Sequence, residues 1–432
     1  MTTAVEEYDN LALPMIISGR ACGSWPMRAE LEGERSLRVL LHRLHRFLAI
    51  LFLYLISAGV TVEVIVFFGN DMNETIESAL VSSAFYMTFA RVLTFARYQP
   101  QMLYVVETMR EDWLRSTSEE RAILRKKCLL AFKLTKFFAL SVVTTGISFV
   151  IIPLLEVLVY TDNLLKHTEK AQLRFKEDAK KVLPYRGYFF YNYTQPEVYG
   201  YTYLANSMVG ALGCTSIAYG TSFSLISTIH GAAKFAIVKR DFEKIDRTTW
   251  TDNKIVGNCV RRHQECIRFA ETVEDIINIL ALAQFVISTG LMCFGGFQLT
   301  TMLEDRARLT KYTSFLNTAV TELFIFSFSG QSLKSEVICA KKAAYTLFSY
   351  LRNFHTNIPI VMKSEDVAEF AYTSNWIGSV LSTNLRMIIL RSRKPCTITA
   401  GKFYDMSLES FLKVMSSSFS YFTVLLAMRD ED

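Results

Sequence analysis

The residue types best suited to catalysis or to metal binding are sparsely placed in this chain of 432 residues. His42 and His45 have a three-residue spacing, but no neighbouring acid or cysteine set completes a metal site. Cys259 and Cys266 are too far apart for a Cys-x-x-Cys knuckle. A glycine-rich phosphate loop and a Gly-x-Ser-x-Gly elbow are both missing from the sequence. We therefore expect a protein that is not an enzyme and has neither a metal nor a cofactor.

Other reactive side chains lie within apolar runs. Glu322 is a functional candidate, because a carboxylate inside a membrane is costly unless it is paired or hydrated. Arg91 lies near the end of a run, so we expect it to snorkel to the cytoplasmic surface without a special role. The last run carries hydroxyl groups that can line a wet pathway or bond back to their own helix: Ser416, Ser417, Ser418, Ser420 and Thr423. These patterns favour binding or conduction over catalysis.

The elements that must position these residues are membrane-spanning helices. The chain is 51% hydrophobic and 13% aromatic, with 8 prolines, and its mean hydropathy is +0.22, which is high for a soluble protein. Seven apolar runs have about the length of a span, although any single one also fits a soluble core helix, and polar residues weaken the sixth. The predicted spans are 47–68, 76–95, 137–160, 201–237, 276–299, 312–328 and 411–428. We predict an all-α membrane protein with seven transmembrane helices.

The loops predict the orientation of the chain in the membrane. Basic residues concentrate before the first span, between spans two and three, and between spans four and five, which places these segments in the cytoplasm. Two glycosylation acceptors, Asn73 and Asn192, fall in the loops that remain outside. The amino terminus is then cytoplasmic, without a cleaved leader, and the carboxyl terminus is extracellular. All cysteines lie in cytoplasmic or membrane segments, so we expect no external disulfide. The net charge of +6 reflects this loop bias, and nucleic acid is not an expected partner.

Three groups of residues make the chain similar to a known family. The most specific runs from Ala400-Gly-Lys-Phe403 through Ser407-Leu-Glu-Ser-Phe411 to Ser418-Phe-Ser-Tyr-Phe422. The others are His263-Gln-Glu-Cys-Ile-Arg-Phe269 with Cys293-Phe-Gly-Gly-Phe297, and Ala371-Tyr-Thr-Ser-Asn-Trp376 with Arg391-Ser-Arg-Lys-Pro395. The whole chain resembles the insect odorant receptors, which are seven-span ligand-gated cation channels with an intracellular amino terminus. Its short loop between spans four and five resembles an odour-tuning subunit rather than the shared co-receptor.

The resemblance implies a function and a set of partners. It implies an odorant-gated channel in the plasma membrane of a sensory neuron, formed with a co-receptor subunit and opened by a small volatile ligand. By position in the terminal pattern, Val424 and Met428 match the family's hydrophobic gate, in a pore-lining last helix over 411–428. A gustatory-type receptor channel is the nearest alternative, and a receptor coupled to G proteins or a transporter is a more distant one.

The family's ligand pocket lies in the outer half of the bundle, between the second, third, fourth and sixth spans. Helical spacing then selects a mostly apolar and aromatic wall with a few hydroxyls and one amide. The predicted wall is Ser82, Phe85, Tyr86, Thr145, Phe149, Ile152, Leu204, Ser207, Met208, Ala211, Asn317, Thr321 and Phe324. The competing interpretation is that these residues only pack helix against helix.

The segment after the sixth span departs from the family pattern. We divide the chain into a cytoplasmic segment 1–46, spans one to six over 47–328, a cytoplasmic anchor over 329–410, the last helix, and an extracellular tail 429–432. Within the anchor, residues 337–363 intervene where the family pattern continues almost directly. We hypothesise that they are either a lineage-specific insertion or a translated intron.

Overall fold

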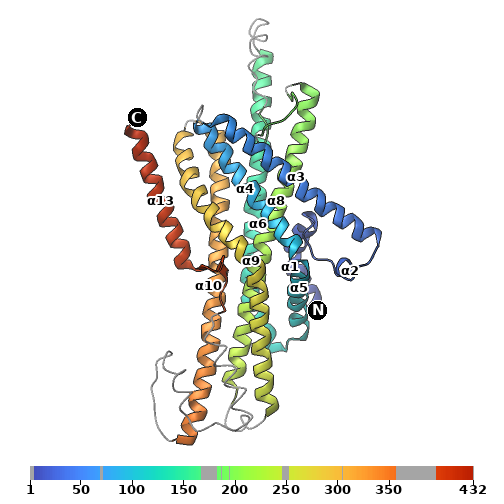
Figure 1. Ribbon diagram of the computed structural model, residues 1–432, viewed down its shortest axis with the longest axis vertical. Helices are drawn as coiled ribbons and strands as arrows, with labels where there is room; N and C mark the ends of the chain where they lie inside the picture. Colours follow the sequence, from blue (N-terminus) through green and yellow to red (C-terminus); the bar gives the residue numbers. More distant parts are fainter. Residues whose placement is uncertain are drawn as a thin grey trace.

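The chain folds into long helices that run along one axis of the molecule (Figure 1). A computed structural model describes residues 4–68, 72–166, 182–185, 187–193, 195–245, 253–303, 305–356 and 396–431. Its helices are α1 (Ala4–Ala21), α2 (Arg28–Leu31), α3 (Leu37–Phe67), α4 (Met72–Arg97), α5 (Gln99–Arg115), α6 (Ser118–Lys166), α8 (Pro196–Glu243), α9 (Asn253–Thr301), α10 (Arg306–Thr356) and α13 (Leu408–Glu431). The strands β1 (Thr399–Ala400) and β2 (Tyr404–Asp405) form an antiparallel hairpin.

The seven predicted spans lie in α3, α4, α6, α8, α9, α10 and α13. In the described part of the chain, six helices are long and apolar enough to cross a membrane, and α10 is not among them. Helix α10 packs against α6, α8, α9 and α13, so protein rather than lipid surrounds much of it. A helix in that position can carry polar residues, which explains its weak hydropathy. Several helices are longer than the predicted spans, and α8, α9 and α10 extend into the lower part of the molecule (Figure 1).

The two ends of the bundle differ in what they carry. Figure 1 places the end of α3, the start of α4, the end of α9, the start of α10 and the carboxyl-terminal end of α13 in its upper part, whereas α5 and its turn into α6 lie in the lower half. The two glycosylation acceptors lie in segments at the upper end, at the start of α4 and just before α8. This is the end that the loop charges predict to be extracellular.

Local capping explains where several helices begin. Before α6, the Thr117 backbone N–H donates to Glu120 at 2.9 Å and the Glu120 N–H donates to the Thr117 hydroxyl at 3.3 Å, which is a capping box. Asp305 accepts from the backbone N–H groups of residues 307 and 308 at 3.1 Å and caps α10. Ser407 accepts from the Ser410 N–H at 3.2 Å and starts α13.

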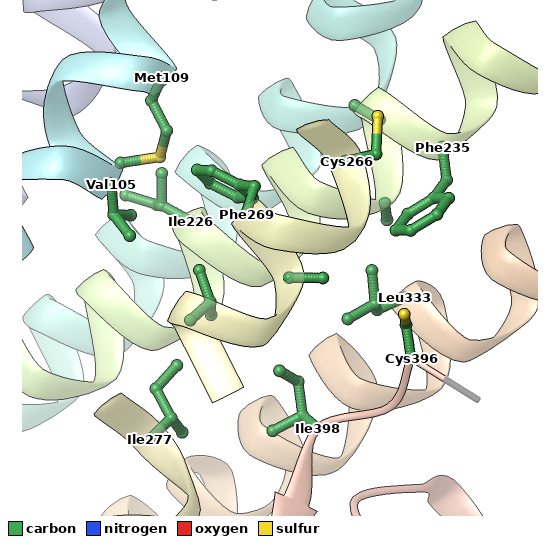
Figure 2. Packing of buried hydrophobic residues seen from close by; sticks show 14 of the residues in the cluster. Val105, Met109, Ile226, Phe235, Cys266, Phe269, Ile277, Leu333, Cys396 and Ile398 are labelled. Atoms are coloured by element: carbon green, nitrogen blue, oxygen red, sulfur yellow. The ribbon is translucent and has the colours of Figure 1, made fainter. Parts of the chain in front are cut away.

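The largest apolar core lies in the lower half of the bundle. Figure 2 shows side chains from α5, α8, α9, α10 and the segment that leads into the hairpin meeting there. Its labelled members are Val105, Met109, Ile226, Phe235, Cys266, Phe269, Ile277, Leu333, Cys396 and Ile398. Helices α1 and α5 pack against the spans α6, α8 and α9. This packing gives the bundle a base below the site described next.

A charged contact reinforces this base. The Asp112 carboxylate on α5 accepts from His230 at 3.0 Å and from Lys234 at 2.5 Å, both on α8. Burial opposes ionisation of Asp112, but these hydrogen bonds and positive charges lower its pKa to about 2. Asp112 is therefore ionised at physiological pH and ties α5 to α8.

The hairpin attaches α13 to the bundle. The Gly401 N–H donates to the Asn278 carbonyl of α9 at 2.9 Å, with Gly401 at φ +60°. Lys402 donates to the Glu274 carboxylate, and Lys334 on α10 pairs with Asp405 at 2.8 Å. Because both α9 and α10 bond to the hairpin, the start of α13 is held in place.

Candidate functional site

A cavity of about 100 Å³ lies between α4, α6, α8, α9 and α10. Its wall is mostly apolar, and it has an aromatic end towards the outer side and a polar end deeper in the bundle. The lining includes Val81, Phe85, Thr88 and Arg91 of α4, Thr145 and Phe149 of α6, Gly210, Gly213, Cys214 and Ile217 of α8, Gln284, Ile287 and Leu291 of α9, and Phe315, Thr318 and Glu322 of α10. Tyr185 completes it from the segment before α8.

Four rings form the aromatic end. Phe149 stacks on Tyr185 with ring centroids 5.3 Å apart, and Phe85 meets Tyr185 edge-on at 5.1 Å. Phe315 of α10 meets Phe149 at 5.9 Å in a T-shaped arrangement. Ring pairs in these geometries contribute a favourable free energy in addition to that of burying their apolar surface. Aromatic faces thus close the outer end and offer an apolar surface to a small molecule.

Tyr185 is held in place by Asn206 on α8. The Tyr185 N–H donates to the Asn206 side-chain oxygen at 3.0 Å, and the Asn206 amide donates to the Tyr185 carbonyl at 3.0 Å. Both residues are buried, so these bonds satisfy backbone groups that have little access to water. A segment without regular secondary structure thereby contributes a fixed ring to the cavity.

Hydroxyl groups join α6 to α10 along the wall. The Thr145 and Thr318 hydroxyls bond each other at 2.9 Å, and Ser141 reaches Thr318 at 2.7 Å. Thr145 also donates to the Ser314 carbonyl at 3.1 Å. Such bonds fix neighbouring helices in a membrane, where water does not compete for them. These hydroxyls therefore serve first as links between helices.

The polar end consists of a buried ion pair. Arg91 Nη2 lies 2.8 Å from Glu322 Oε1 and donates to Gln284 Oε1 at 2.5 Å. The Thr221 hydroxyl also donates to Glu322. The expectation that Arg91 snorkels to the cytoplasmic surface is wrong, because its side chain is 1% exposed and is paired inside the bundle. Glu322, a candidate from the sequence, has its costly charge offset by this partner.

The cavity gathers only part of the predicted wall. Phe85, Thr145 and Phe149 line it. Helices α8 and α10 present stripes to the cavity that lie about one residue away from the predicted ones, which is a rotation of about 100° on a helix with 3.6 residues per turn. The predicted residues that lie outside the cavity lining are Ser82, Tyr86, Ile152, Leu204, Ser207, Met208, Ala211, Asn317, Thr321 and Phe324.

Specific contacts explain several of these placements. Ser82 and Tyr86 bond the Thr61 hydroxyl on α3, so they face that helix. Leu204 and Met208 are exposed on the outer surface of α8. Phe324 packs against Phe411 of α13 at 5.8 Å. The pattern of apolar positions marks helical faces correctly but does not say which face meets the cavity.

Helix α13 presents two faces. One packs on α9 and α10, where the Ser418 hydroxyl donates to the Thr289 carbonyl at 3.3 Å. Ser418 is therefore not among the hydroxyls available to a pore, contrary to the expectation for the serine run. The other face exposes Ser416, Ser417, Ser420, Thr423 and Val424. Met428 lies in the last turns of α13, but its side chain is outside the described residues.

The described side chains form neither a metal-binding group nor a disulfide. Among them, no three His, Cys, Asp or Glu residues gather in a group that could hold a metal ion. All eight cysteines are free thiols. Asn192, a predicted glycosylation acceptor, is exposed, whereas the side chain of Asn73 is outside the described set.

Comparison with known proteins identifies the family. The sequence model described as 7tm Odorant receptor matches residues 43–347 and 358–419, which is most of the chain. The chain belongs to the odorant receptor family. The match passes through much of 337–363 and omits residues 348–357. Helix α10 continues to Thr356, and residues 357–363 lie outside the described part, so the insertion hypothesis stays a prediction.

Individual relatives of this odorant receptor are distant. It is 23% identical to odorant receptor 10 of Aedes albopictus over 240 residues, which are 54% of this chain and 56% of that receptor. It is 27% identical to odorant receptor 13a of Drosophila melanogaster over 190 residues, 40% of this chain and 38% of the other. The chain thus spans about half the length, or less, of these relatives.

Solved structures share its fold. The olfactory receptor OR5 of Machilis hrabei in complex with eugenol superimposes with a TM-score of 0.69 at 14% identity, covering 97% of both chains. A second structure of the same receptor superimposes with a TM-score of 0.61 at 14% identity, covering 98% of this chain and 97% of the other. The prediction of an all-α membrane protein with seven spans is therefore confirmed.

Proposed function

We propose that this odorant receptor is the ligand-binding, odour-tuning subunit of an odorant-gated cation channel in the plasma membrane of olfactory sensory neurons. The observation that carries the proposal is the cavity between α4, α6, α8, α9 and α10. It combines an apolar aromatic end with a few polar groups, which suits a small volatile molecule. Burying about 200 Å² of apolar ligand surface contributes about 5 kcal/mol before the costs of association.

The proposed binding residues are those around the aromatic end: Phe85, Thr145 and Phe149, with Tyr185 and Phe315. Phe149 contributes most, because its ring contacts Tyr185 and Phe315 as well as the cavity. The predicted wall residues that lie on other faces of their helices are not part of the proposed binding site.

Helix α13 is the proposed pore-lining element. Its exposed face carries hydroxyls and Val424, whose exposure is 54% in the isolated chain. In a channel made of several subunits this face turns towards the central pathway, and Val424 with Met428 forms a hydrophobic gate that excludes water when it is narrow. A ligand that favours the open arrangement shifts α13 outward through α9 and α10, which contact both the cavity and α13.

Two further assignments concern partners and modification. A single chain leaves this face of α13 uncovered, so we assign a co-receptor subunit as the second component of the channel. The short connection between α8 and α9 supports the tuning role. We assign Asn73 and Asn192 as the glycosylated residues on the extracellular side.

Two-electrode recording from oocytes tests this function. The chain is expressed alone and together with an insect co-receptor, and a broad panel of volatiles is applied. We expect an odour-evoked inward cation current only in the presence of the co-receptor. Protein that reaches the surface with the co-receptor and stays silent to every volatile contradicts the proposal. A current in oocytes that express the chain alone would show that the channel does not require the co-receptor.

A further inference from the structure

The ion pair at the deep end of the cavity leaves part of Arg91 unused. Arg91 Nη2 is engaged by Glu322 and Gln284. Arg91 Nε and Nη1 are buried without a hydrogen-bond partner among the described residues, although Arg91 lines the cavity. A buried donor without an acceptor is expensive, and native structures contain few of them. The cavity therefore has donor positions to which nothing in the described chain is bonded.

These donors lie deep in the bundle, so they belong to the cavity and not to the protein surface. Glu322 lies sixteen residues below the start of α10 at Arg306, which is about 24 Å along a helix. A guanidinium group at such a depth needs an acceptor for its N–H groups, since lipid provides none. The two oxygens that contact Arg91, Glu322 Oε1 and Gln284 Oε1, both lie at the same nitrogen, Nη2.

The charge of the pair determines which acceptor suits the site. Arg91 and Glu322 lie 2.8 Å apart and neutralise each other, and the Thr221 hydroxyl also bonds Glu322. An anionic ligand would meet the Glu322 carboxylate at the same end of the cavity, and like charges repel strongly where water is scarce. A neutral oxygen acceptor meets no such repulsion.

We propose that Arg91 is the polar recognition residue of this cavity and that the ligand is a neutral carbonyl compound with an apolar body. The carbonyl oxygen accepts a hydrogen bond from Nε or Nη1, and the apolar body lies among Phe85, Phe149 and Tyr185. Phe315 and Glu322 are seven residues apart on α10, about 10 Å, which sets the length of such a ligand. The inference rests on the proposed function, because it specifies the ligand class of the same site.

Isosteric ligand pairs test the proposal directly. Each pair replaces a carbonyl oxygen by a methylene group of nearly the same shape: cyclohexanone and methylenecyclohexane, benzaldehyde and styrene, acetophenone and α-methylstyrene. Binding is measured as the ligand-dependent rise in unfolding temperature of the full-length chain co-purified with a co-receptor, and potency is measured by recording. In the wild type, the carbonyl member of a pair binds about tenfold or more tightly, because a hydrogen bond to a charged donor contributes at least that factor.

Three variants locate the effect. Arg91→Met with Glu322→Met removes both charges together, which a buried pair tolerates better than the loss of one partner. This double variant brings the carbonyl preference to about one while the alkenes still bind. Arg97→Met, the same replacement at the exposed end of α4, leaves the preference intact. Glu322→Gln frees the charge of Arg91, so benzoate, which the wild type rejects, becomes a ligand.

The outcomes separate this proposal from the proposed function. Currents or thermal shifts without a carbonyl preference overturn the role of Arg91 and indicate that water fills its donor positions, while the receptor function stands. A carbonyl preference that survives in the double variant also overturns it. Thermal shifts with the expected preference but no current support the subsite and count against the channel function. If none of the pairs produces either binding or current, the proposed ligand class is wrong.

Discussion

Gly210 on α8 lies directly against the ring of Tyr185. A β-carbon placed on Gly210 would come within 2.2 Å of Tyr185 Cε2, closer than any such atoms approach in proteins. The ring that closes the outer end of the cavity can occupy its position only because residue 210 has no side chain. Tyr185 is also bonded through its backbone to Asn206, so it cannot easily move away. Together these contacts link the shape of the cavity to two positions on one helix.

Gly210→Ala is therefore expected to disturb ligand recognition. The added methyl group displaces the Tyr185 ring, and overpacking of this kind costs about 1–3 kcal/mol. We expect the concentration for half-maximal odour response to rise about tenfold. Gly200→Ala is the matched control on the same helix, because its β-carbon meets nothing within 4 Å. An unchanged response curve for Gly210→Ala would show that Tyr185 does not shape the ligand site.

Asn206→Ala tests the other contact of Tyr185. The substitution removes two hydrogen bonds and leaves the Tyr185 N–H and carbonyl without their partner, at a cost of about 1–3 kcal/mol for each group. We expect weaker odour responses and a lower unfolding temperature. Asn206→Asp keeps the acceptor but loses the donor, so it falls between the wild type and the alanine variant. Equal effects of the two substitutions would argue against the paired bonds.

Phe149→Ala removes the ring shared by the aromatic end. Loss of its stacking with Tyr185 and of its contact with the ligand is expected to raise the half-maximal concentration about tenfold or more. Surface labelling checks that expression is maintained. Phe137→Ala, on the outer surface of the same helix, is the control and should leave potency unchanged. If both variants behave like the wild type, Phe149 is only a packing residue.

The sequence predicted the fold well because hydropathy and loop charge act over whole helices. Seven apolar runs and the basic loops are sufficient to place the spans, and the polar sixth run is weak because α10 is shielded by other helices. The terminal motif over 400–422 is the most specific indication of the odorant receptor family. These signals survive substitution at single positions, so one sequence is enough to read them.

The site was less predictable because it depends on helix rotation and on irregular backbone. A stripe such as Leu204 and Met208 satisfies helical spacing as well as Gly210 and Cys214 do, and only packing decides which one faces inward. Tyr185 follows a long connection with no pattern that points to the cavity. The sequence alone predicts a snorkelling Arg91 because its partners, Glu322 and Gln284, are far away in the sequence.

Asp112→Asn is expected to weaken the packed base. Its carboxylate bonds His230 and Lys234, and its pKa of about 2 lies below the ordinary value. The stabilisation is therefore fully present above about pH 4, the range of an unfolded aspartate, and is lost as the pH falls towards 2. We expect a lower unfolding temperature at pH 7, measured in detergent, with odour potency little changed. A variant as stable as the wild type would mean that the apolar core alone joins α5 to α8.

Val424→Ser tests the hydrophobic gate. A constriction lined by valine holds no water when it is narrow, whereas a hydroxyl group stabilises water there and lowers the barrier to ions. With the co-receptor present, we expect a resting cation current without odour, together with a smaller fold increase on odour application. Val424→Ile keeps the site apolar and should have little resting current. Val143→Ser, at an exposed position on α6 away from α13, controls for the substitution itself. If the serine variant reaches the surface, responds to odour and shows the same resting current as the wild type, Val424 is not at the gate and the exposed face of α13 contacts lipid or a partner subunit instead.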